Sequence, residues 1–487
     1  MSIKKYKARK DNTITDAFAA NLISRSKKSN MGASDTMEIF NIYAHGVPVK
    51  NDDGELERDE DGRVVQTLEN ARILIEFPID DITQDITDGK LPNSGVVYKL
   101  NLYNAPHAFT LPEKFTIEIF PISKSWSEGV GLDMEEYSDK GASDGGIGSD
   151  WLSASSGVSW DNEGGDYIDD GYRKAFFFDK GTEDLELDIS DVVQAWLDGD
   201  IENYGLLLKL EDSVEQALSK SSTYTKRFFA RGTEYFYKRP CISAEWNSSK
   251  KDDRGNFYAE SLLRSNEDNT NIIYFTNVVS GVKKNIPTVT TGGDNDLTVK
   301  IYSDSTRETE LEPEVLTVTN DIVGEYKASL VLDTELESVY IDWEDAGGQI
   351  YFSEEVDVLT RKPSTGEHPV YVSNITNMKS VYSNTETATF RLYTRLKDWN
   401  PTIYTVSSKN IENTIVENAF FRIVRVVDEE VIIAYGDGTM LSYDVDGNYF
   451  HLDMSLLEPD FAYRIELQYE IGENLQQQPE TFKFRVE

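Results

Sequence analysis

Strict alternation of apolar and polar residues is the feature that most limits the folds open to this chain. In "ATFRLYTRL", residues 388–396, every second side chain from Ala388 to Leu396 is apolar or a threonine. The same period of two recurs at 463–471 and closes the chain at 482–487. Because successive side chains of a strand point to opposite faces, this period predicts half-buried β-strands. We therefore expect an all-β fold over most of the chain.

The chain length and two polar breaks predict several β-sandwich modules in series. A chain of 487 residues is longer than one hydrophobic core usually supports. The runs "EWNSSKKDDRGN" and "TRKPSTGEHP" lack apolar periodicity and read as linkers. The expected order is a basic N-terminal arm at 1–28, a β-sandwich at 29–250, an Ig-like β-sandwich at 255–362 and a C-terminal β domain at 366–487.

One short helix interrupts the strand pattern. In "LDISDVVQAWLDGD", residues 187–200, the apolar residues Ile189, Val192, Val193, Trp196 and Leu197 fall on one helical face. Asp188 or Ser190 is the expected cap, and Gly199 the expected stop. Trp196 is interpreted as a core residue, so this helix is expected to close one end of a sandwich.

The charge balance argues against nucleic acid and anionic membranes as partners. The chain carries 48 Lys and Arg against 87 Asp and Glu, a formal net charge of −39. Binding to phosphates requires a basic surface that releases counterions, and an acidic surface is repelled instead. The basic start is followed by no long apolar run, so neither a signal peptide nor a membrane span is expected.

The first 28 residues depart from the acidic composition. They hold eight Lys or Arg and only two acids. This segment is either a solvated terminal arm or an arm that docks on an acidic neighbour, such as another copy of the chain. The basic residues proposed for docking are Lys4, Lys5, Lys7, Arg9 and Lys10.

Catalytic chemistry finds little support in the sequence. "SWSEGVGLD" places Glu128 five residues before Asp133, and paired carboxylates can cleave glycosidic bonds. A loop with two glycines is a poor holder for such a pair, so a polar loop is the favoured interpretation. Cys241 is the single cysteine, which leaves no disulfide or thiolate cluster, and the four histidines lack metal-ligand spacing. No enzyme activity and no catalytic residue is predicted.

Three acidic, glycine-rich segments raise the possibility of structural calcium. "DNEGGD" at 161–166, "GGDND" at 292–296 and "DVDGN" at 444–448 supply the oxygen ligands that Ca²⁺ prefers. None has the spacing of an EF-hand loop. Turns between strands explain all three more simply, so no cofactor is expected apart from a possible structural Ca²⁺.

The stretch 133–172 is the segment where recognition is most expected. It is too long for an ordinary hairpin loop and interleaves aromatic residues with acids and glycines. Such rings can pack in the core, form a protein interface or contact a glycan. The aromatic interface candidates are Tyr137, Trp151, Trp160, Tyr167 and Tyr172.

An ordered set of motifs in the first half resembles the DNRLRE-type β-sandwich, a fold shared with some carbohydrate-binding modules. The turn and strand "SNMGASDTMEIF" resembles the opening of that family, and Arg72 and Phe77 in "ARILIEFPI" match its signature strand. The remaining matches are "YKLNLYN", "SWSEG", "LDISDVVQAWLDGDIENYGLLLK" and "RPCISAEW". The chain departs from the family at "FFARGTEYFYKRP". The resemblance implies a jelly-roll sandwich in which the tryptophan of "SWSEG" packs and Glu128 lies in a loop.

The arrangement of the whole chain resembles virion structural proteins of large, contractile-tailed marine bacteriophages. The resemblance includes "MSIKKYKARKDNTI", "SVYSNTETATFRLYTRLKDWNPTIY" and "MLSYDVDGNYFHLDMSLLEPDFAYRIELQY". It implies a non-enzymatic component of a virion, in its tail, baseplate, neck or fibre, that docks on other virion proteins in several copies. The alternative is a fibre module that binds a glycan or another receptor.

Overall fold

Two separate units of β-structure make up the chain. The computed structural model describes residues 3–487 except 20–24, 51–54, 59–61, 63, 108–111, 133–147, 217–221, 253–256, 288–296, 360–368, 408–412 and 472–473. The first unit is Ile3–Trp246, and the second comprises Asn247–Glu487. The break between them lies inside the polar run "EWNSSKKDDRGN".

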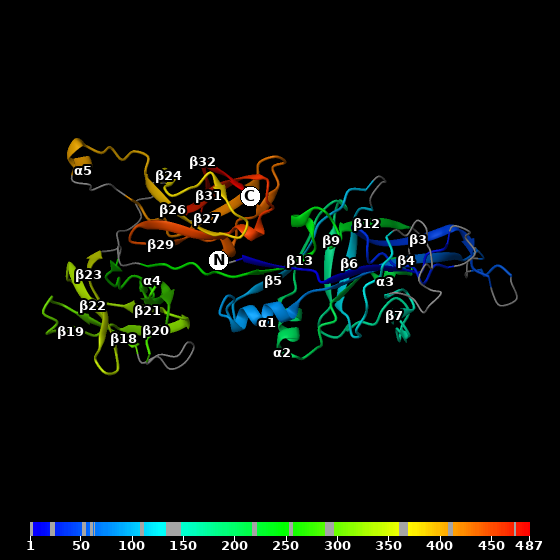
Figure 1. The fold of residues 1–487 in the computed structure, drawn as a ribbon, viewed down its shortest axis with the longest axis horizontal. Helices are drawn as coiled ribbons and strands as arrows, with labels where there is room; N and C mark the ends of the chain where they lie inside the picture. The colour runs from blue at the N-terminus through cyan, green and yellow to red at the C-terminus, as the bar shows by residue number, and fades with distance from the viewer. Residues whose placement is uncertain are drawn as a thin grey trace. The chain divides into compact units, whose positions relative to one another are not determined.

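The first unit is a two-sheet sandwich (Figure 1). One sheet has the order β1-β13-β5-β10, and the other has the order β12-β3-β4-β11-β6-β9 with β2 paired to β4. The two inner faces enclose a core that includes Ile73, Leu100 and Leu208. The strands are β1 Ile3–Lys7, β2 Lys10–Thr15, β3 Thr36–Pro48, β4 Gln66–Glu76, β5 Val97–Leu102, β6 Phe115–Pro121, β7 Ser153–Ser155, β8 Val158–Ser159, β9 Lys174–Phe178, β10 Leu185–Asp188, β11 Leu206–Leu210, β12 Thr223–Phe229 and β13 Cys241–Glu245.

The start of the chain belongs to this sandwich, which corrects the prediction of an arm at 1–28. Strand β1 pairs with β13, with Lys7 opposite Cys241, and β2 pairs with β4, with Thr13 opposite Ile73. Tyr6 and Ile14 are buried in these strands. Their burial and the ladder hydrogen bonds fix the segment in place, although its lysines suggested a solvated arm.

The described residues of the first unit include three α-helices: α1 Ile79–Thr87, α2 Ser190–Asp198 and α3 Asp212–Glu215. Helix α2 confirms the predicted helix, because Gly199 ends it with a φ of 76° and Trp196 is buried. The Asp188 carboxylate accepts hydrogen bonds from the Ser190 amide and hydroxyl. Helix α1 contacts α2 and was not predicted (Figure 1).

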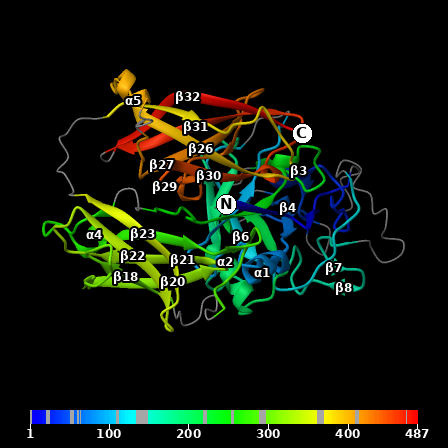
Figure 2. The same ribbon diagram turned by 60° about the vertical axis from the view of Figure 1, so that its left-hand side comes forward.

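The second unit begins with a small two-sheet sandwich. One sheet has the order β14-β23-β22-β18-β19, and the other has the order β15-β21-β20 (Figure 2). Trp343 and Tyr326, one from each sheet, are buried in the core between them. The elements are β14 Phe257–Tyr258, α4 Asn266–Asn269, β15 Asn271–Thr276, β16 Val278–Val279, β17 Val282–Lys283, β18 Leu297–Tyr302, β19 Glu310–Leu311, β20 Val315–Ile322, β21 Glu325–Val331, β22 Ser338–Asp345 and β23 Ile350–Leu359.

A third pair of sheets completes the second unit, with the orders β24-β26-β30-β29 and β25-β32-β31-β27-β28. Phe390 packs between the rings of Tyr382, Phe450 and Phe484, with ring centroids 5.5, 5.0 and 6.1 Å away. The elements are β24 Tyr371–Ile375, β25 Val381–Tyr382, β26 Thr387–Leu396, α5 Ile403–Ser407, β27 Ala419–Arg425, β28 Val431–Ile433, β29 Ser442–Asp444, β30 Gly447–Asp453, β31 Ala462–Ile471 and β32 Asn474–Val486. The all-β prediction of tandem sandwich modules is confirmed. None of the helices in the described part of the chain has the length and apolar character needed to span a bilayer.

Candidate functional site

The tryptophans of the stretch 133–172 are core residues and not a recognition surface. Trp151 is 5% exposed and Trp160 is 6% exposed, and both pack with Trp126 and Leu207 in one cluster. The Trp160 indole donates a 2.8 Å hydrogen bond to the carbonyl oxygen of Asp150. The expectation that Trp151 and Trp160 contact a partner or glycan therefore requires correction, because their rings are covered by the protein itself.

The three tyrosines predicted with them have different positions. Tyr167 is half-buried and its ring lies 4.5 Å from the ring of Phe120, between centroids. Tyr172 is half-buried and packs against the core of the sandwich. Tyr137 lies outside the described residues. The stretch thus supplies packing for the first unit, and the structure assembles no aromatic binding face from its described residues.

The basic residues at the start of the chain are engaged within the first unit. Lys4 forms an ion pair with Asp85, and Lys10 forms one with Glu76 at 2.7 Å. Arg9 lies 3.6 Å from Asp80, and Lys7 donates to the carbonyl oxygen of Phe236. Lys5 is half-buried in the ladder opposite Ser243. The proposal that these cations reach an acidic neighbour is thus corrected, because acids of the same unit already neutralise Lys4, Arg9 and Lys10.

Glu128, the first carboxylate of "SWSEGVGLD", is a structural residue. It accepts hydrogen bonds from the Arg231 guanidinium at 2.8 and 2.9 Å, and from the Asp11 amide at 3.0 Å. Trp126 beside it is buried and donates from its indole to the carbonyl oxygen of Tyr204. Asp133 lies outside the described residues. Through these hydrogen bonds, Glu128 connects its own loop to strand β2 and to the segment that contains Arg231. Its carboxylate is therefore engaged within the fold.

Two of the three acidic, glycine-rich segments are turns held by their own carboxylates. The Asp166 carboxylate accepts hydrogen bonds from the amides of Asp161 and Asn162, each at 2.8 Å. Asp444 accepts from the Asp446 amide at 3.0 Å, and 292–296 lies outside the described residues. Where the structure describes the chain, no three His, Cys, Asp or Glu residues gather as a set of metal ligands.

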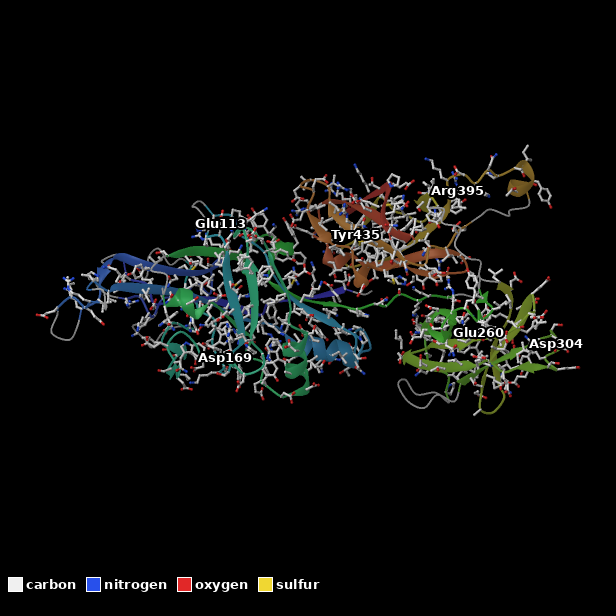
Figure 3. All side chains as sticks on the ribbon, turned by 180° about the vertical axis from the view of Figure 1, so that it is seen from behind. Glu113, Asp169, Glu260, Asp304, Arg395 and Tyr435 are labelled. Atoms are coloured by element: carbon white, nitrogen blue, oxygen red, sulfur yellow. The ribbon has the colours of Figure 1, made fainter. Side chains whose placement is uncertain are left out.

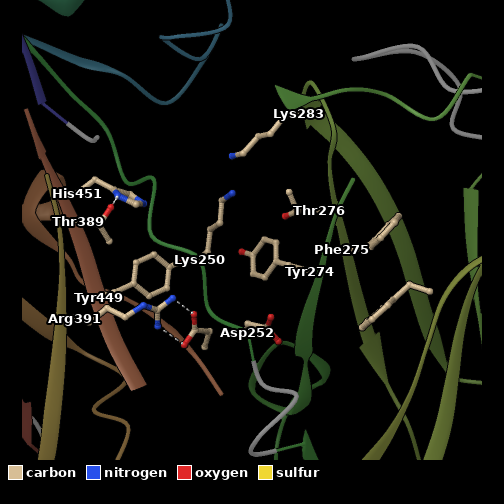
Figure 4. A pocket seen from close by; sticks show the side chains of 12 residues that line it. Lys250, Asp252, Tyr274, Phe275, Thr276, Lys283, Thr389, Arg391, Tyr449 and His451 are labelled. Atoms are coloured by element: carbon tan, nitrogen blue, oxygen red, sulfur yellow. Dashed lines mark hydrogen bonds and ion pairs between the residues drawn. The ribbon is translucent and has the colours of Figure 1, made fainter. Parts of the chain in front are cut away.

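A cleft in the second unit was not predicted and is the strongest candidate for a binding site (Figure 4). It has a volume of about 480 Å³, within the range of small-molecule sites. Its lining residues come from three parts of the second unit. These are the linker before β14, the sandwich from β14 to β23, which we call the middle sandwich, and the sandwich from β24 to β32, which we call the C-terminal sandwich. They are Lys250, Asp252, Tyr274, Phe275, Thr276, Lys283, Phe352, Thr389, Arg391, Asp444, Tyr449 and His451.

The linker reaches the cleft because it extends the sheet of the C-terminal sandwich. The Tyr443 amide donates to the carbonyl oxygen of Lys250 at 2.9 Å, and the Asp252 amide donates to that of Tyr443 at 3.2 Å. The Lys250 amide also donates to the Ser442 hydroxyl at 3.0 Å. These bonds fix the backbone of Lys250 beside β29, so the Lys250 side chain extends from a fixed position next to the cleft.

Ion pairs organise the charged lining of the cleft. Arg391 donates two parallel hydrogen bonds to Asp444 at 3.0 and 2.8 Å, and its guanidinium lies 5.0 Å from the centroid of the Tyr449 ring. Lys250 and Lys283 both pair with the single carboxylate of Glu325, on its two different oxygens. Burial lowers the pKa of Lys250 to about 8, and the positive charge of Lys283 contributes to this fall.

Sequence patterns could not have found this cleft. Its cations, rings and hydroxyls come from segments up to 201 positions apart, between Lys250 and His451, and no short motif links them. Lys250 lies in a segment that the sequence marked as distinctive, and that segment was interpreted only as a linker. The lining brings together three cations, two carboxylates, aromatic rings and hydroxyls.

Comparisons with known proteins give no family. No protein-family model and no curated protein matches the chain. Among solved structures, the titin fragment A168169 is 8% identical, with 49% of this chain and 95% of that chain covered and a TM-score of 0.15. The Ig1-2 module of the Drosophila receptor protein tyrosine phosphatase DLAR is also 8% identical, covers 45% of this chain and 91% of its own, and has a TM-score of 0.15. The D00-D0 domain of intimin is 10% identical, with 38% and 84% covered and a TM-score of 0.12. Similarities with TM-scores this low carry no argument about fold or function.

Proposed function

We propose that this chain is a non-enzymatic structural component of a phage virion that docks on other virion proteins and is present in several copies. The observation that carries the docking proposal is a group of exposed aliphatic side chains at one end of the middle sandwich. We name this group the aliphatic patch. It consists of Val278, Val279, Val282, Ile322 and Val323, which are 44% to 59% exposed.

Two turns held together by backbone hydrogen bonds form the aliphatic patch. The β16–β17 hairpin turns at Ser280 and Gly281, which have φ values of 55° and 78°. The neighbouring turn at 322–324 is bound to it, because the Asn277 amide donates to the carbonyl oxygen of Gly324 at 2.8 Å. The Asn285 side chain accepts from the Gly324 amide at 2.6 Å. The five side chains therefore come from two turns that are joined by hydrogen bonds.

The composition of the aliphatic patch suits a protein interface. Valine and isoleucine are stiff at χ1, so little side-chain entropy is lost when a partner covers them. Exposed aliphatic residues scattered singly are ordinary, whereas several on two adjoining turns favour a binding surface. Val279 and Val282 form a cross-strand pair in the hairpin. Lys283 and Glu325 flank it and form an ion pair, which provides a polar rim.

A second exposed apolar site provides the further surface that an assembly subunit needs. Leu262 is 91% exposed and Leu263 is 96% exposed, in the turn that follows Glu260 (Figure 3). A subunit that links neighbours must contact them through more than one surface. The resemblance of the sequence to contractile-tail phage proteins supports a virion as the place of assembly, and the modular β-sandwiches suit a spacer or decorating role.

Particle incorporation tests the docking proposal. Val279→Ser with Val282→Ser removes apolar contact from the aliphatic patch, and we expect roughly tenfold or greater loss of the chain from purified phage particles, measured by quantitative mass spectrometry. Val427→Ser is the matched control, because Val427 is 72% exposed and lies in the turn between β27 and β28. Equal incorporation of the patch variant and the control would contradict docking through this surface.

A further inference from the structure

A buried lysine lies against the side chain of an asparagine in the first unit. Lys226, on β12, is 0% exposed, and its Nζ donates a 2.7 Å hydrogen bond to Oδ1 of Asn104. The rings of Phe178 and Phe228 flank this Nζ, with their centroids 4.7 and 5.0 Å away. A buried lysine normally pairs with a carboxylate, because an isolated charge is costly in a low-dielectric interior. Among the described residues, the Lys226 Nζ makes hydrogen bonds only to uncharged oxygens.

Two backbone carbonyl groups hold the lysine nitrogen in place. The Nζ of Lys226 donates to the carbonyl oxygens of Gly181 at 2.9 Å and Glu183 at 2.8 Å, both between β9 and β10. Burial lowers the pKa of Lys226 to about 8. Roughly a tenth of the chains therefore carry a neutral amine at pH 7. A neutral amine has two N–H donors and one lone pair, so with both donors on these carbonyls the lone pair is directed at the carboxamide of Asn104.

The backbone of Asn104 is held beside the strand that carries Lys226. Asn104 forms an antiparallel bridge with Phe228 of β12. Its amide also donates a 2.6 Å hydrogen bond to the carboxylate of Asp184. Both partners of the lysine–amide contact are thus positioned by the fold, and a reaction between two groups gains most in rate when both are held in this way.

A carboxylate for proton transfer lies in the same turn. Oε1 of Glu183 accepts from the Lys180 amide at 2.6 Å, whereas Oε2 is buried and has no hydrogen-bond partner in the described part of the chain. The charge of Glu183 acts on Lys226, because it opposes the fall in the Lys226 pKa. A carboxylate beside an amine can take up its proton and return it to a leaving group.

We infer that Lys226 and Asn104 form an intramolecular isopeptide bond. The neutral Nζ of Lys226 attacks Cγ of Asn104, so that a bond forms between Nζ and Cγ and the bond from Cγ to Nδ2 breaks. The proton lost by Nζ passes through the Glu183 carboxylate to Nδ2, which leaves as ammonia. No atom is oxidised or reduced. The product is an amide between β12 of one sheet and the segment after β5 of the other, and it covalently links the two sheets of the first unit.

The mass of the intact full chain tests the bond. Its formation removes one molecule of ammonia, so we expect the chain to be about 17 Da lighter than its sequence mass by electrospray mass spectrometry. Tandem mass spectrometry of a digest should then yield a branched peptide that contains both Lys226 and Asn104. The chain is measured as purified and again after incubation at about pH 8, where half of the Lys226 amines are neutral.

Matched variants locate the bond. Asn104→Ala removes the carboxamide from a half-buried position and should show its full sequence mass. Lys226→Arg should do the same, because it keeps a cation for the two carbonyls but has no reactive amine. Glu183→Gln should lower the cross-linked fraction roughly tenfold after a fixed incubation, and Glu183→Asp should restore part of it. Circular dichroism establishes that each variant is folded.

A second lysine–asparagine contact in the chain provides an internal control. The Nζ of Lys251 donates to Oδ1 of Asn418 at 3.2 Å, and both residues are partly exposed to solvent. A solvated ammonium group is a poor nucleophile, so we expect no branched peptide that joins Lys251 to Asn418.

Three results would overturn the inference. The full sequence mass both before and after incubation would leave Lys226 as a structural ammonium group held by three oxygens. A loss of about 17 Da that persists in Asn104→Ala would place the lost ammonia at another residue. A branched peptide between Lys251 and Asn418 in equal yield would show that cross-linking does not depend on the buried site. None of these results bears on particle incorporation, so failure here is distinguishable from failure of the docking proposal.

Discussion

The amide of Asn277 donates a 2.8 Å hydrogen bond to the carbonyl oxygen of Gly324, and this bond joins the β16–β17 hairpin to the turn after β20. Gly324 has a φ of 73°, and a Cβ at this position would lie 2.7 Å from the Lys284 nitrogen and 3.0 Å from the Asn277 oxygen. Both the backbone conformation and the close approach therefore require glycine. This contact keeps the two halves of the aliphatic patch together.

Gly324→Ala should separate the two turns. We expect the free energy of unfolding to fall by about 2 kcal/mol, from strain at positive φ and from displacement of the neighbouring backbone. Gly348→Ala is the control, because Gly348 has a φ of 78° but no atom lies within 4 Å of the position that its Cβ would take. Chemical denaturation measures the free energy of unfolding of both variants. An equal decrease in the two would show that the contact between the turns does not contribute to stability.

Trp160→Ala should act as a core deletion in the first unit. Trp160 is 6% exposed and its indole is hydrogen-bonded to Asp150, so we expect a loss of about 3 kcal/mol in the free energy of unfolding. Phe177→Ala is the comparison, because Phe177 is 58% exposed on β9 and should change stability little. Urea denaturation followed by fluorescence distinguishes them, and an unchanged midpoint for Trp160→Ala would be inconsistent with a packed indole.

Asp11 and Asp16 should make the first unit less stable as the pH rises. Burial raises the pKa of Asp11 to about 7 and that of Asp16 to about 6, from the ordinary aspartate value of 3.8. The folded state therefore holds protons that the unfolded state has released, and stability falls between about pH 4 and pH 7. For Asp11, which is 1% exposed, the loss is at most ~4 kcal/mol, because each pKa unit corresponds to about 1.4 kcal/mol.

Asp11→Asn tests this linkage, because asparagine does not titrate. Its side-chain oxygen can still accept the hydrogen bond that the Arg231 amide donates to Asp11. We expect the decline in melting temperature between pH 4 and pH 7 to become shallower in Asp11→Asn, measured by scanning calorimetry. Asp80→Asn should keep the original slope, because the Asp80 side chain is 88% exposed. Identical slopes in all three proteins would rule out Asp11 as the titrating group.

Alternation in the sequence predicted the strands well because it reports a local property. Strand β31, Ala462–Ile471, buries Tyr463, Ile465 and Tyr469 on the expected face. The helix at Ser190–Asp198 was predictable for the same reason, since one apolar stripe and one glycine define it.

Features that depend on distant partners were not predictable. The lysines of β1 suggested a free arm because Asp85 and strand β13, their partners, lie 81 or more positions away. Trp151 and Trp160 stand among acids and glycines, and only the fold reveals that they pack against Leu207. The cleft likewise joins Lys250, Tyr274 and Arg391, which no local pattern connects.

Docking of the chain in a virion through the aliphatic patch is tested most directly by a density map of the intact phage particle. We expect density for the two β units in several symmetry-related copies, with Val279, Val282 and Ile322 covered by a neighbouring virion protein. Particles that lack the chain, or a map in which these three side chains face solvent in every copy, would contradict it.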